Sequence, residues 1–281
     1  MRQSRAGSRA AGSIPGNCAH CPVQDKQFFI FRHGFMMNAL DDVGRERDLH
    51  TLMQSKPALR LLYNKFYQRY IRCIGRCPSS GSIVEIGSGA SFAKEIIPDI
   101  ITSDILPYSS VDICVDARQM PFRDGSLRAI LMLNTLHHIP DAERFFSEAR
   151  RCLRPNGRIL IVDQYPGWLS YWIFKFLHHE PFNEKAETWQ FDSTGPLSSA
   201  NGALCWIIFY RDREKFKQLF PELCIDAIEP HSPLCYWLAG GLKPWSLLPK
   251  KGFRLASMFD DAVSAVVPRL SSFVDIELVR C

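Results

Sequence analysis

The feature that most constrains the fold is an alternation of strand-like and helix-like segments between residues 82 and 162. The strand-like runs cover residues 82–86, 100–105, 111–115, 129–133 and 158–162, with helix-like segments at 92–97 and 141–153. The fourth run is almost continuously apolar, which is typical of a strand buried on both faces. This alternation predicts an α/β fold with a doubly wound, mostly parallel sheet, whose ligands bind beyond the carboxyl ends of the strands.

The later part of the chain predicts two more strands, at residues 224–228 and 273–279, and a helix at 213–220. The sheet is therefore expected to have seven strands. Two insertions rich in Trp, Tyr, Phe and Pro, residues 164–211 and 232–270, are expected to cover its open edge. The expected organisation is an irregular extension at 1–50 and a single domain at 51–281, with its core at 80–163, 212–231 and 271–281.

Composition excludes several classes of function. The net charge is +5, and three of these charges come from Arg2, Arg5 and Arg9, so charge gives no argument for nucleic-acid binding. The sequence contains no run of 18 consecutive apolar residues, so it predicts no transmembrane helix. Ten cysteines in a chain of this length predict unpaired thiols and a cytoplasmic protein. Cys18 and Cys21 have zinc-ligand spacing, but no second pair follows, and no metal is expected.

A glycine loop follows the first strand, and its details discriminate among nucleotide ligands. Residues 84–91 read Val-Glu-Ile-Gly-Ser-Gly-Ala-Ser. Phe92 occupies the sixth place counted from Gly87, where a dinucleotide-binding loop needs a small residue. The Gly-Lys-Ser/Thr sequence of a nucleoside triphosphate loop is absent. The loop therefore argues against both of these ligand classes.

Four segments in order resemble the class I S-adenosylmethionine (SAM)-dependent methyltransferases. Residues 85–91 resemble the family's first motif, Glu/Asp-x-Gly-x-Gly-x-Gly, with Ser91 in place of the third glycine. Residues 115–126, Val-Asp-Ala-Arg-Gln-Met-Pro-Phe-Arg-Asp-Gly-Ser, are similar to the Asp-Ala-x-x-Leu-Pro-Phe-x-Asp-x-Ser signature of the type 11 subgroup. Residues 133–139 resemble the segment that passes the methionine end of the cofactor. Residues 153–158 resemble the turn that leads into the fifth strand. The resemblance implies a Rossmann-like methyltransferase fold and SAM as cofactor.

The resemblance also implies where the cofactor binds. Asp104, at the end of the second strand, corresponds to the acid that accepts hydrogen bonds from both ribose hydroxyls. Asp116 would accept from the adenine amino group, and the backbone of Ala117 would read the ring edge. The expected cofactor-binding residues are Glu85, Gly87, Ser88, Gly89, Asp104, Ile105, Asp116, Ala117 and Asn134.

The chemistry of methyl transfer directs attention to the histidines. The methyl group of SAM is bonded to a sulfonium, so no metal is needed to make the leaving group. An acceptor hydroxyl must lose a proton, and histidine has a pKa suited to that task. His138, after the fourth strand, and His179, in the first insertion, are the candidate catalytic bases. The alternative role for His138 and its neighbour His137 is to brace the cofactor loop by hydrogen bonds to backbone.

The insertions are expected to choose the methyl acceptor. Residues 166–177 predict either a lid helix or an interfacial helix, and residues 237–251 form a second apolar and basic patch that suits peripheral contact with the inner membrane face. The polar loop 191–202, beside Trp189 and Trp206, suits either a sugar or an ordinary loop role.

Three functions remain open. The long C-terminal portion resembles that of bacterial type 11 methyltransferases of cell-surface glycan assembly. The first hypothesis is therefore methyl transfer to oxygen of a glycan or lipid-linked small molecule. Quinone or polyketide-like metabolites are alternative acceptors, and a degenerate SAM-binding interaction protein is the third reading. Nucleic acid is not expected as a partner, because Asn134-Thr135-Leu136-His137 stands where a nucleic-acid methyltransferase carries Asn/Asp-Pro-Pro-Tyr/Phe.

Overall fold

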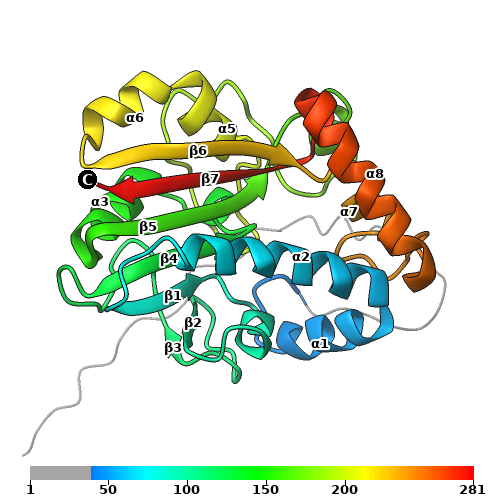
Figure 1. Ribbon diagram of the computed structural model, residues 1–281, viewed down its shortest axis with the longest axis horizontal. Coiled ribbons are helices and arrows are strands. Elements are labelled where there is room, and N and C mark those ends of the chain that lie inside the picture. Colours follow the sequence, from blue (N-terminus) through cyan, green and yellow to red (C-terminus); the bar gives the residue numbers. More distant parts are fainter. Residues whose placement is uncertain (1–38) are drawn as a thin grey trace, which may run out of the picture. The chain divides into compact units, whose positions relative to one another are not determined.

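A seven-stranded sheet organises the computed structural model, which describes residues 39–281. The strands are β1 (Ser82–Ile86), β2 (Ile100–Asp104), β3 (Ile113–Cys114), β4 (Leu127–Leu133), β5 (Leu153–Gln164), β6 (Leu223–His231) and β7 (Phe273–Arg280). Their order is β3-β2-β1-β4-β5-β7-β6 (Figure 1). The first five strands are parallel, and β7 runs antiparallel to both of its neighbours. The predicted mostly parallel, seven-stranded α/β sheet is confirmed.

Helices cover both faces of this sheet. They are α1 (Arg45–Ser55), α2 (Pro57–Ile74), α3 (Ala142–Cys152), α4 (Ser170–Phe176), α5 (Leu204–Trp206), α6 (Arg213–Leu219), α7 (Cys235–Leu238) and α8 (Phe253–Val266). In Figure 1, α2 crosses one face of the sheet, and its apolar side packs there with the first residue of α8. The other face is covered by α3, α5 and α6.

Apolar alternation along β4 explains why two cores form. Ile130 and Met132 face the core that contains α3, whereas Ala129 and Leu131 face the core that contains α2. Because successive side chains of a strand point to opposite faces, a continuous apolar run must be buried on both sides. The prediction for this strand is therefore confirmed by its burial.

Several local expectations differ from the structure. Helix α1 begins at Arg45, inside the segment expected to be irregular. Residues 92–97 contain a short 3₁₀ turn at Phe92–Glu95 instead of an α-helix. Pro98 follows closely, and a proline cannot donate the backbone hydrogen bond that would extend the turn.

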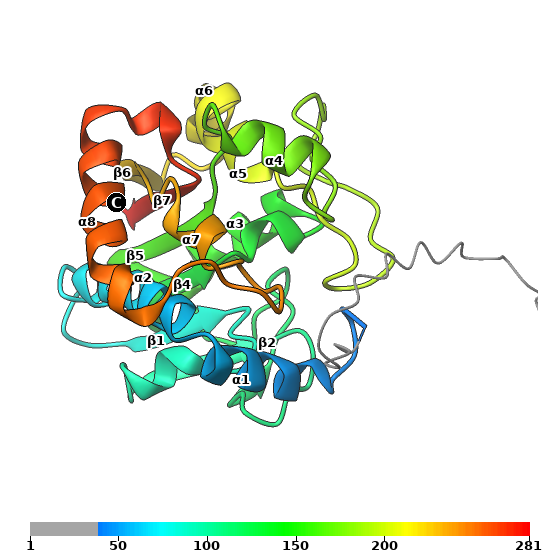
Figure 2. The same cartoon turned by 90° about the vertical axis from the view of Figure 1, so that its right-hand side faces the viewer.

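The first insertion covers a face and the ligand end of the sheet, whereas the sequence predicted cover for the open edge. Its α5 and the π-helical turn Ile207–Arg211 pack in the core beside α3. Its other helix, α4, lies with α1 and α7 on the side that Figure 2 presents to the viewer. Residues 232–270 supply α7 and α8, and α8 packs against β6.

The expectation that the cysteines are unpaired is wrong for one pair, because Cys224 and Cys281 form a disulfide. The antiparallel pairing of β6 and β7 places the start of one strand beside the end of the other, although 57 residues separate the two cysteines. The pair Cys18 and Cys21 lies outside the described residues. Among residues 39–281, no helix is both long and apolar enough to cross a membrane.

Candidate cofactor and acceptor site

A cavity of about 1000 Å³ opens at the carboxyl ends of β1, β2 and β4. It lies where the strand order reverses between β1 and β4, the usual ligand position in an open α/β sheet. Side chains of α1, α4 and α7, the elements seen in front of the strands in Figure 2, complete its wall. A cavity of this size is sufficient for a drug-sized ligand.

The glycine loop after β1 adopts a conformation that requires glycine. Gly87 has φ +74°, and a Cβ atom there would lie 2.4 Å from the Oγ1 atom of Thr135. Gly89 has φ +53°, and its backbone N–H donates a 2.9 Å hydrogen bond to Oδ2 of Asp104. Ser91 also has positive φ, at +57°. The loop thus lies close against the turn after β4 and presents backbone to the cavity.

Asp104 ends β2 as a buried carboxylate on the cavity wall. Its Oδ1 accepts a 3.0 Å hydrogen bond from the Leu106 backbone N–H. Burial raises the pKa of this carboxyl, while the backbone donors at Leu106 and Gly89 act in the opposite direction. Each carboxylate oxygen keeps acceptor capacity beyond its one backbone donor. A diol such as that of ribose is a ligand that would use this capacity.

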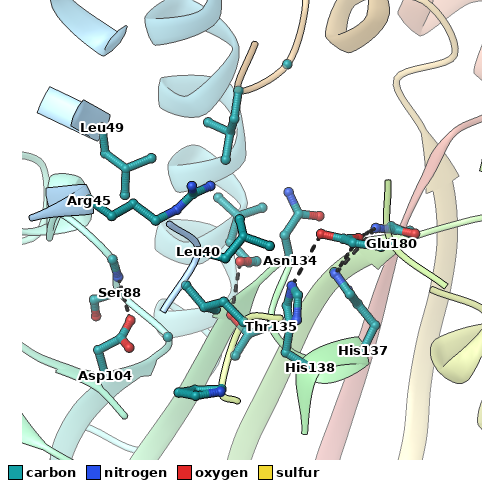
Figure 3. A pocket seen from close by; sticks show the side chains of 18 of the residues that line it. Leu40, Arg45, Leu49, Ser88, Asp104, Asn134, Thr135, His137, His138 and Glu180 are labelled. Carbon is teal, nitrogen blue, oxygen red and sulfur yellow. Dashed lines mark hydrogen bonds and ion pairs between the residues drawn. The ribbon is translucent and has the colours of Figure 1, made fainter. Parts of the chain in front are cut away.

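Asn134 provides a second polar group for a cofactor. It directly follows β4, has φ +52° and lines the cavity (Figure 3). Among the residues that the structure describes, its buried Oδ1 atom has no hydrogen-bond partner. A buried acceptor without a partner is costly, so a ligand with an N–H donor would stabilise it. The ammonium of a methionine moiety carries such donors, and the residues present therefore fit SAM.

The other expected cofactor residues also reach the cavity wall. They are Glu85, Ser88, Ile105, Asp116 and Ala117. Asp116 is already engaged, since both of its carboxylate oxygens accept hydrogen bonds from the Arg118 guanidinium. That contact lowers the pKa of Asp116 and occupies the atoms expected to meet adenine.

Glu85 is the most deeply buried carboxyl on the cofactor side. Burial raises its pKa to about 7. The group therefore changes charge near neutral pH, unlike an ordinary glutamate.

A cluster of histidines surrounds one carboxylate on the opposite side of the cavity (Figure 3). The Nε2 atoms of His137 and His138 lie 3.3 Å and 3.5 Å from Oε2 and Oε1 of Glu180. His178 Nδ1 and His179 Nε2 lie 3.5 Å and 3.7 Å from the same carboxylate. Four imidazoles therefore converge on one glutamate.

Backbone and carboxylate acceptors fix the two histidines that follow β4. His137 Nδ1 donates to Oδ1 of Asp163 at 2.5 Å, and His138 Nδ1 donates to the carbonyl of Ser199 at 3.1 Å. Burial by itself would lower the pKa of His137, but the carboxylates of Asp163 and Glu180 raise it to about 10.

The remaining members of the cluster titrate differently. Burial by itself would raise the pKa of Glu180, but the charge and hydrogen bonds of His137 and His138 lower it far below its usual range. Burial lowers the pKa of His178 to about 4 and also lowers the pKa of His179. These two imidazoles are therefore neutral at pH 7.

The structure thus brings the two predicted bases, His138 and His179, to one carboxylate that sequence reasoning had not assigned a role. Asp163 was also missed, although its place at the end of a predicted strand signals the ligand edge of the sheet. Arg45 lines the cavity from a segment expected to be irregular, and its sequence context gave no signal.

Aromatic and aliphatic side chains dominate the wall beside the histidine cluster. They include Ile173, Phe174, Leu177, Tyr236 and Trp237. By contrast, Trp189, considered as a stacking face for a sugar, is fully buried in the core and donates its indole N–H to Asp212. It is not available to a sugar.

Comparison with known proteins agrees with this site. Residues 85–161 match a family described as a methyltransferase domain, and the predicted resemblance to the SAM-dependent methyltransferases of the type 11 subgroup is confirmed. SAM is the cofactor of this family.

Individual relatives match over short stretches. The 27-O-demethylrifamycin SV methyltransferase of Amycolatopsis mediterranei is 40% identical over 48 residues, covering 17% of this chain and 18% of the relative. Methyltransferase GfsG of Streptomyces halstedii is 29% identical over 84 residues, covering 30% of each protein. The matched stretch thus spans less than a third of either curated relative.

A solved structure is similar over a greater length. The geranyl diphosphate C-methyltransferase of Streptomyces coelicolor is 13% identical with a TM-score of 0.46, covering 89% of this chain and 92% of that one.

Proposed function

We propose that this protein transfers the methyl group of SAM to a hydroxyl oxygen of an apolar, polyketide-like small molecule. The observation that carries the proposal is one continuous cavity with two different sides. Asp104 and the glycine loop line one side, and the histidine cluster with its aromatic neighbours lines the other.

The chain's own residues would perform three tasks. Asp104 and Asn134 hold the cofactor, and the Gly87–Gly89 loop lets it approach the strands closely. SAM supplies a methyl group already activated by a sulfonium charge. The protein must align the acceptor oxygen with that methyl group, and such positioning can contribute roughly 7–11 kcal/mol. His138 or His179 would receive the hydroxyl proton at Nε2, and a base contributes on the order of 10²–10⁴-fold.

The cavity wall supports an apolar acceptor in preference to a glycan. Phe174 packs at 5.4 Å from Trp237 and 6.1 Å from Phe182, forming an aromatic wall beside the histidines. A sugar would need hydroxyl partners and a stacking face, and Trp189 is buried in the core. Two curated relatives, from Amycolatopsis and Streptomyces, are methyltransferases by name, and the first acts on a rifamycin.

We also propose peripheral contact with a membrane through α4. Trp168 and Trp172 are 60% and 58% exposed, and Leu177, which lines the cavity, is 72% exposed. An apolar helix face at the mouth of an apolar cavity would let a lipophilic acceptor enter from a lipid surface. Flotation with anionic liposomes tests this contact. The Trp168→Ser/Trp172→Ser double variant should float less than the unchanged protein, and equal flotation would contradict the contact.

The methyl acceptor can be found by incubating the purified protein with labelled SAM and a panel of phenolic and polyketide hydroxyl compounds, followed by mass spectrometry. Transfer to an apolar hydroxyl compound supports the proposal, whereas transfer only to glycans contradicts the acceptor class. Binding of SAM without transfer to any extract component would favour a non-catalytic interaction protein.

His138→Ala and His179→Ala separate the two candidate bases. The variant that lacks the base should keep its affinity for SAM and lose most of its turnover. Glu143→Gln, on α3 and away from the cavity, is the control variant and should keep the turnover of the unchanged protein. A histidine variant with unchanged turnover is eliminated as the base.

A further inference from the structure

The hydrogen bonds of two cavity histidines, His137 and His138, place unprotonated ring nitrogens opposite a carboxylate when both rings are neutral. The partners of His137 Nδ1 and His138 Nδ1 are a carboxylate and a carbonyl, which only accept hydrogen bonds. Each Nδ1 therefore carries the hydrogen, and each Nε2 in the neutral tautomer has a bare lone pair. Both Nε2 atoms face the Glu180 carboxylate, which also offers lone pairs. A cation must lie between them, either as protons on the imidazoles or as a metal ion.

The distances favour a metal ion. Charge-assisted N–H···O bonds are about 2.7–2.9 Å long, and the two separations here are 3.3 Å and 3.5 Å. Two ligands bound to one zinc ion at about 2.0–2.2 Å in tetrahedral geometry lie roughly 3.4 Å apart. The three ligand atoms all lie within 4.8 Å of one another. These separations are therefore compatible with three ligands around a shared ion.

The residues that hold the three candidate ligands in place also support a metal site. Asp163, which is fully buried, holds His137 through Nδ1, the arrangement by which carboxylates orient metal-binding imidazoles. The Gln164 amide donates to Oε2 of Glu180 at 2.8 Å and fixes the carboxylate. Its second contact, 3.4 Å to His137 Nε2, is too long to satisfy that nitrogen well. The alternative group of His178, His179 and Glu180 is less enclosed, since His179 is 53% exposed.

We propose that His137, His138 and Glu180 bind a divalent transition-metal ion on the acceptor side of the cavity. Two imidazoles and one carboxylate suit zinc, iron or nickel, whereas magnesium prefers oxygen ligands. Three protein ligands would leave a coordination position open, and all three residues line the cavity. If the proposed function holds, an acceptor hydroxyl would occupy it. The assignment removes His138 from the role of base and leaves His179.

Zinc binding to chelator-treated protein tests this site without any assay of methyl transfer. The full chain should carry Cys18→Ser and Cys21→Ser in every sample, so that two thiols at zinc-ligand spacing do not compete for the added metal. Calorimetry and elemental analysis should give one tightly bound zinc per chain. Cobalt in place of zinc should give the visible absorption of a low-symmetry site containing nitrogen ligands.

Three variants locate the ion. Glu180→Gln should abolish tight zinc binding, and Asp163→Asn should weaken it about 10–100-fold. Glu143→Gln should bind as the parent does. His179→Ala distinguishes the two histidine groups, because loss of zinc in that variant, with binding retained in His138→Ala, would overturn the assignment. Thermal melts establish that each variant is folded.

Absence of zinc binding by the parent, or unchanged binding in Glu180→Gln, would overturn the inference. SAM affinity measured on the same samples keeps this outcome separate from the proposed function. Protein that transfers methyl groups but binds no zinc contradicts only the metal site. Protein that binds zinc but transfers no methyl group contradicts only the proposed reaction.

Discussion

The two sides of the cavity are built by different means. The cofactor side consists of backbone at the end of β1, one carboxylate at the end of β2 and one amide after β4. The acceptor side consists of side chains from α4, α7 and long loops, with Glu180 at the centre of four imidazoles. One side is thus fixed by local turns of the sheet, and the other by contacts between distant segments.

This difference predicts different sensitivities to mutation. Changes on the cofactor side should alter SAM affinity whatever the acceptor is. Changes on the acceptor side should leave SAM affinity intact and alter acceptor binding or turnover. The following variants, from the largest expected effect to the smallest, test that division.

Gly87→Val should abolish SAM binding. The new Cβ would lie 2.4 Å from Thr135 Oγ1 at a residue with φ +74°, so the loop must move away from β4. A side chain in this backbone region also costs about 1–2 kcal/mol. Calorimetry measures the affinity, and Gly252→Ala is the control because its Cβ would make only ordinary contacts. Wild-type SAM affinity in Gly87→Val would remove the loop from the cofactor site.

Glu85→Gln should change how stability depends on pH in the cofactor-free protein. Burial raises the pKa of Glu85 in the folded protein to about 7 from its ordinary value of 4.5, so as pH rises the unfolded chain loses this proton at a lower pH than the folded protein does. Stability from this group is complete below pH 4.5 and is lost as pH rises towards 7, by up to about 3 kcal/mol. The variant should lack this loss in chemical denaturation between pH 4.5 and 7. Parallel curves for both proteins would contradict the assignment.

Asp104→Asn should weaken SAM binding by about one to two orders of magnitude. The neutral amide loses charge-assisted hydrogen bonds worth roughly 1.5–3 kcal/mol, and each 1.4 kcal/mol is tenfold in affinity. Calorimetry is the measurement, with Asp124→Asn, an exposed carboxylate before β4, as the matched control. Equal SAM affinities in the two variants would show that Asp104 does not hold the cofactor.

Phe174→Leu should change acceptor binding and little else. Phe174 lines the cavity and packs against Phe182 and Trp237, so the smaller side chain alters the aromatic wall. KM for an apolar acceptor should rise several-fold, since the lost burial is of order 1 kcal/mol, while SAM affinity stays the same. Phe259→Leu, exposed on α8, makes the same chemical change away from the cavity. A fall in SAM affinity would show that the two sides are not independent.

The cofactor side was largely predictable because its determinants are local. A strand followed by Gly87-Ser-Gly89, and a second strand that ends in Asp104, place these groups at one edge of any parallel sheet. The sequence did not reveal that Arg118 engages Asp116, because an ion pair two residues apart depends on the turn conformation.

The acceptor side was not predictable to the same degree because its partners are far apart in the chain. Ser199 lies 61 residues from the histidine that it holds, and Asp163 lies 26 residues from His137. The disulfide between Cys224 and Cys281 has the same origin, since only the pairing of β6 with β7 brings the cysteines together.

The sequence by itself determined the sheet, its parallel part and the turn that holds the cofactor, since apolar periodicity and glycine positions act within a few residues. Only the tertiary structure decided that α1 closes the cavity, that Trp189 belongs to the core and that four histidines meet at Glu180. The physical reason is that the burial and charge of a group depend on which distant segments exclude water from it. The local periodicity of apolar residues does not specify those long-range contacts.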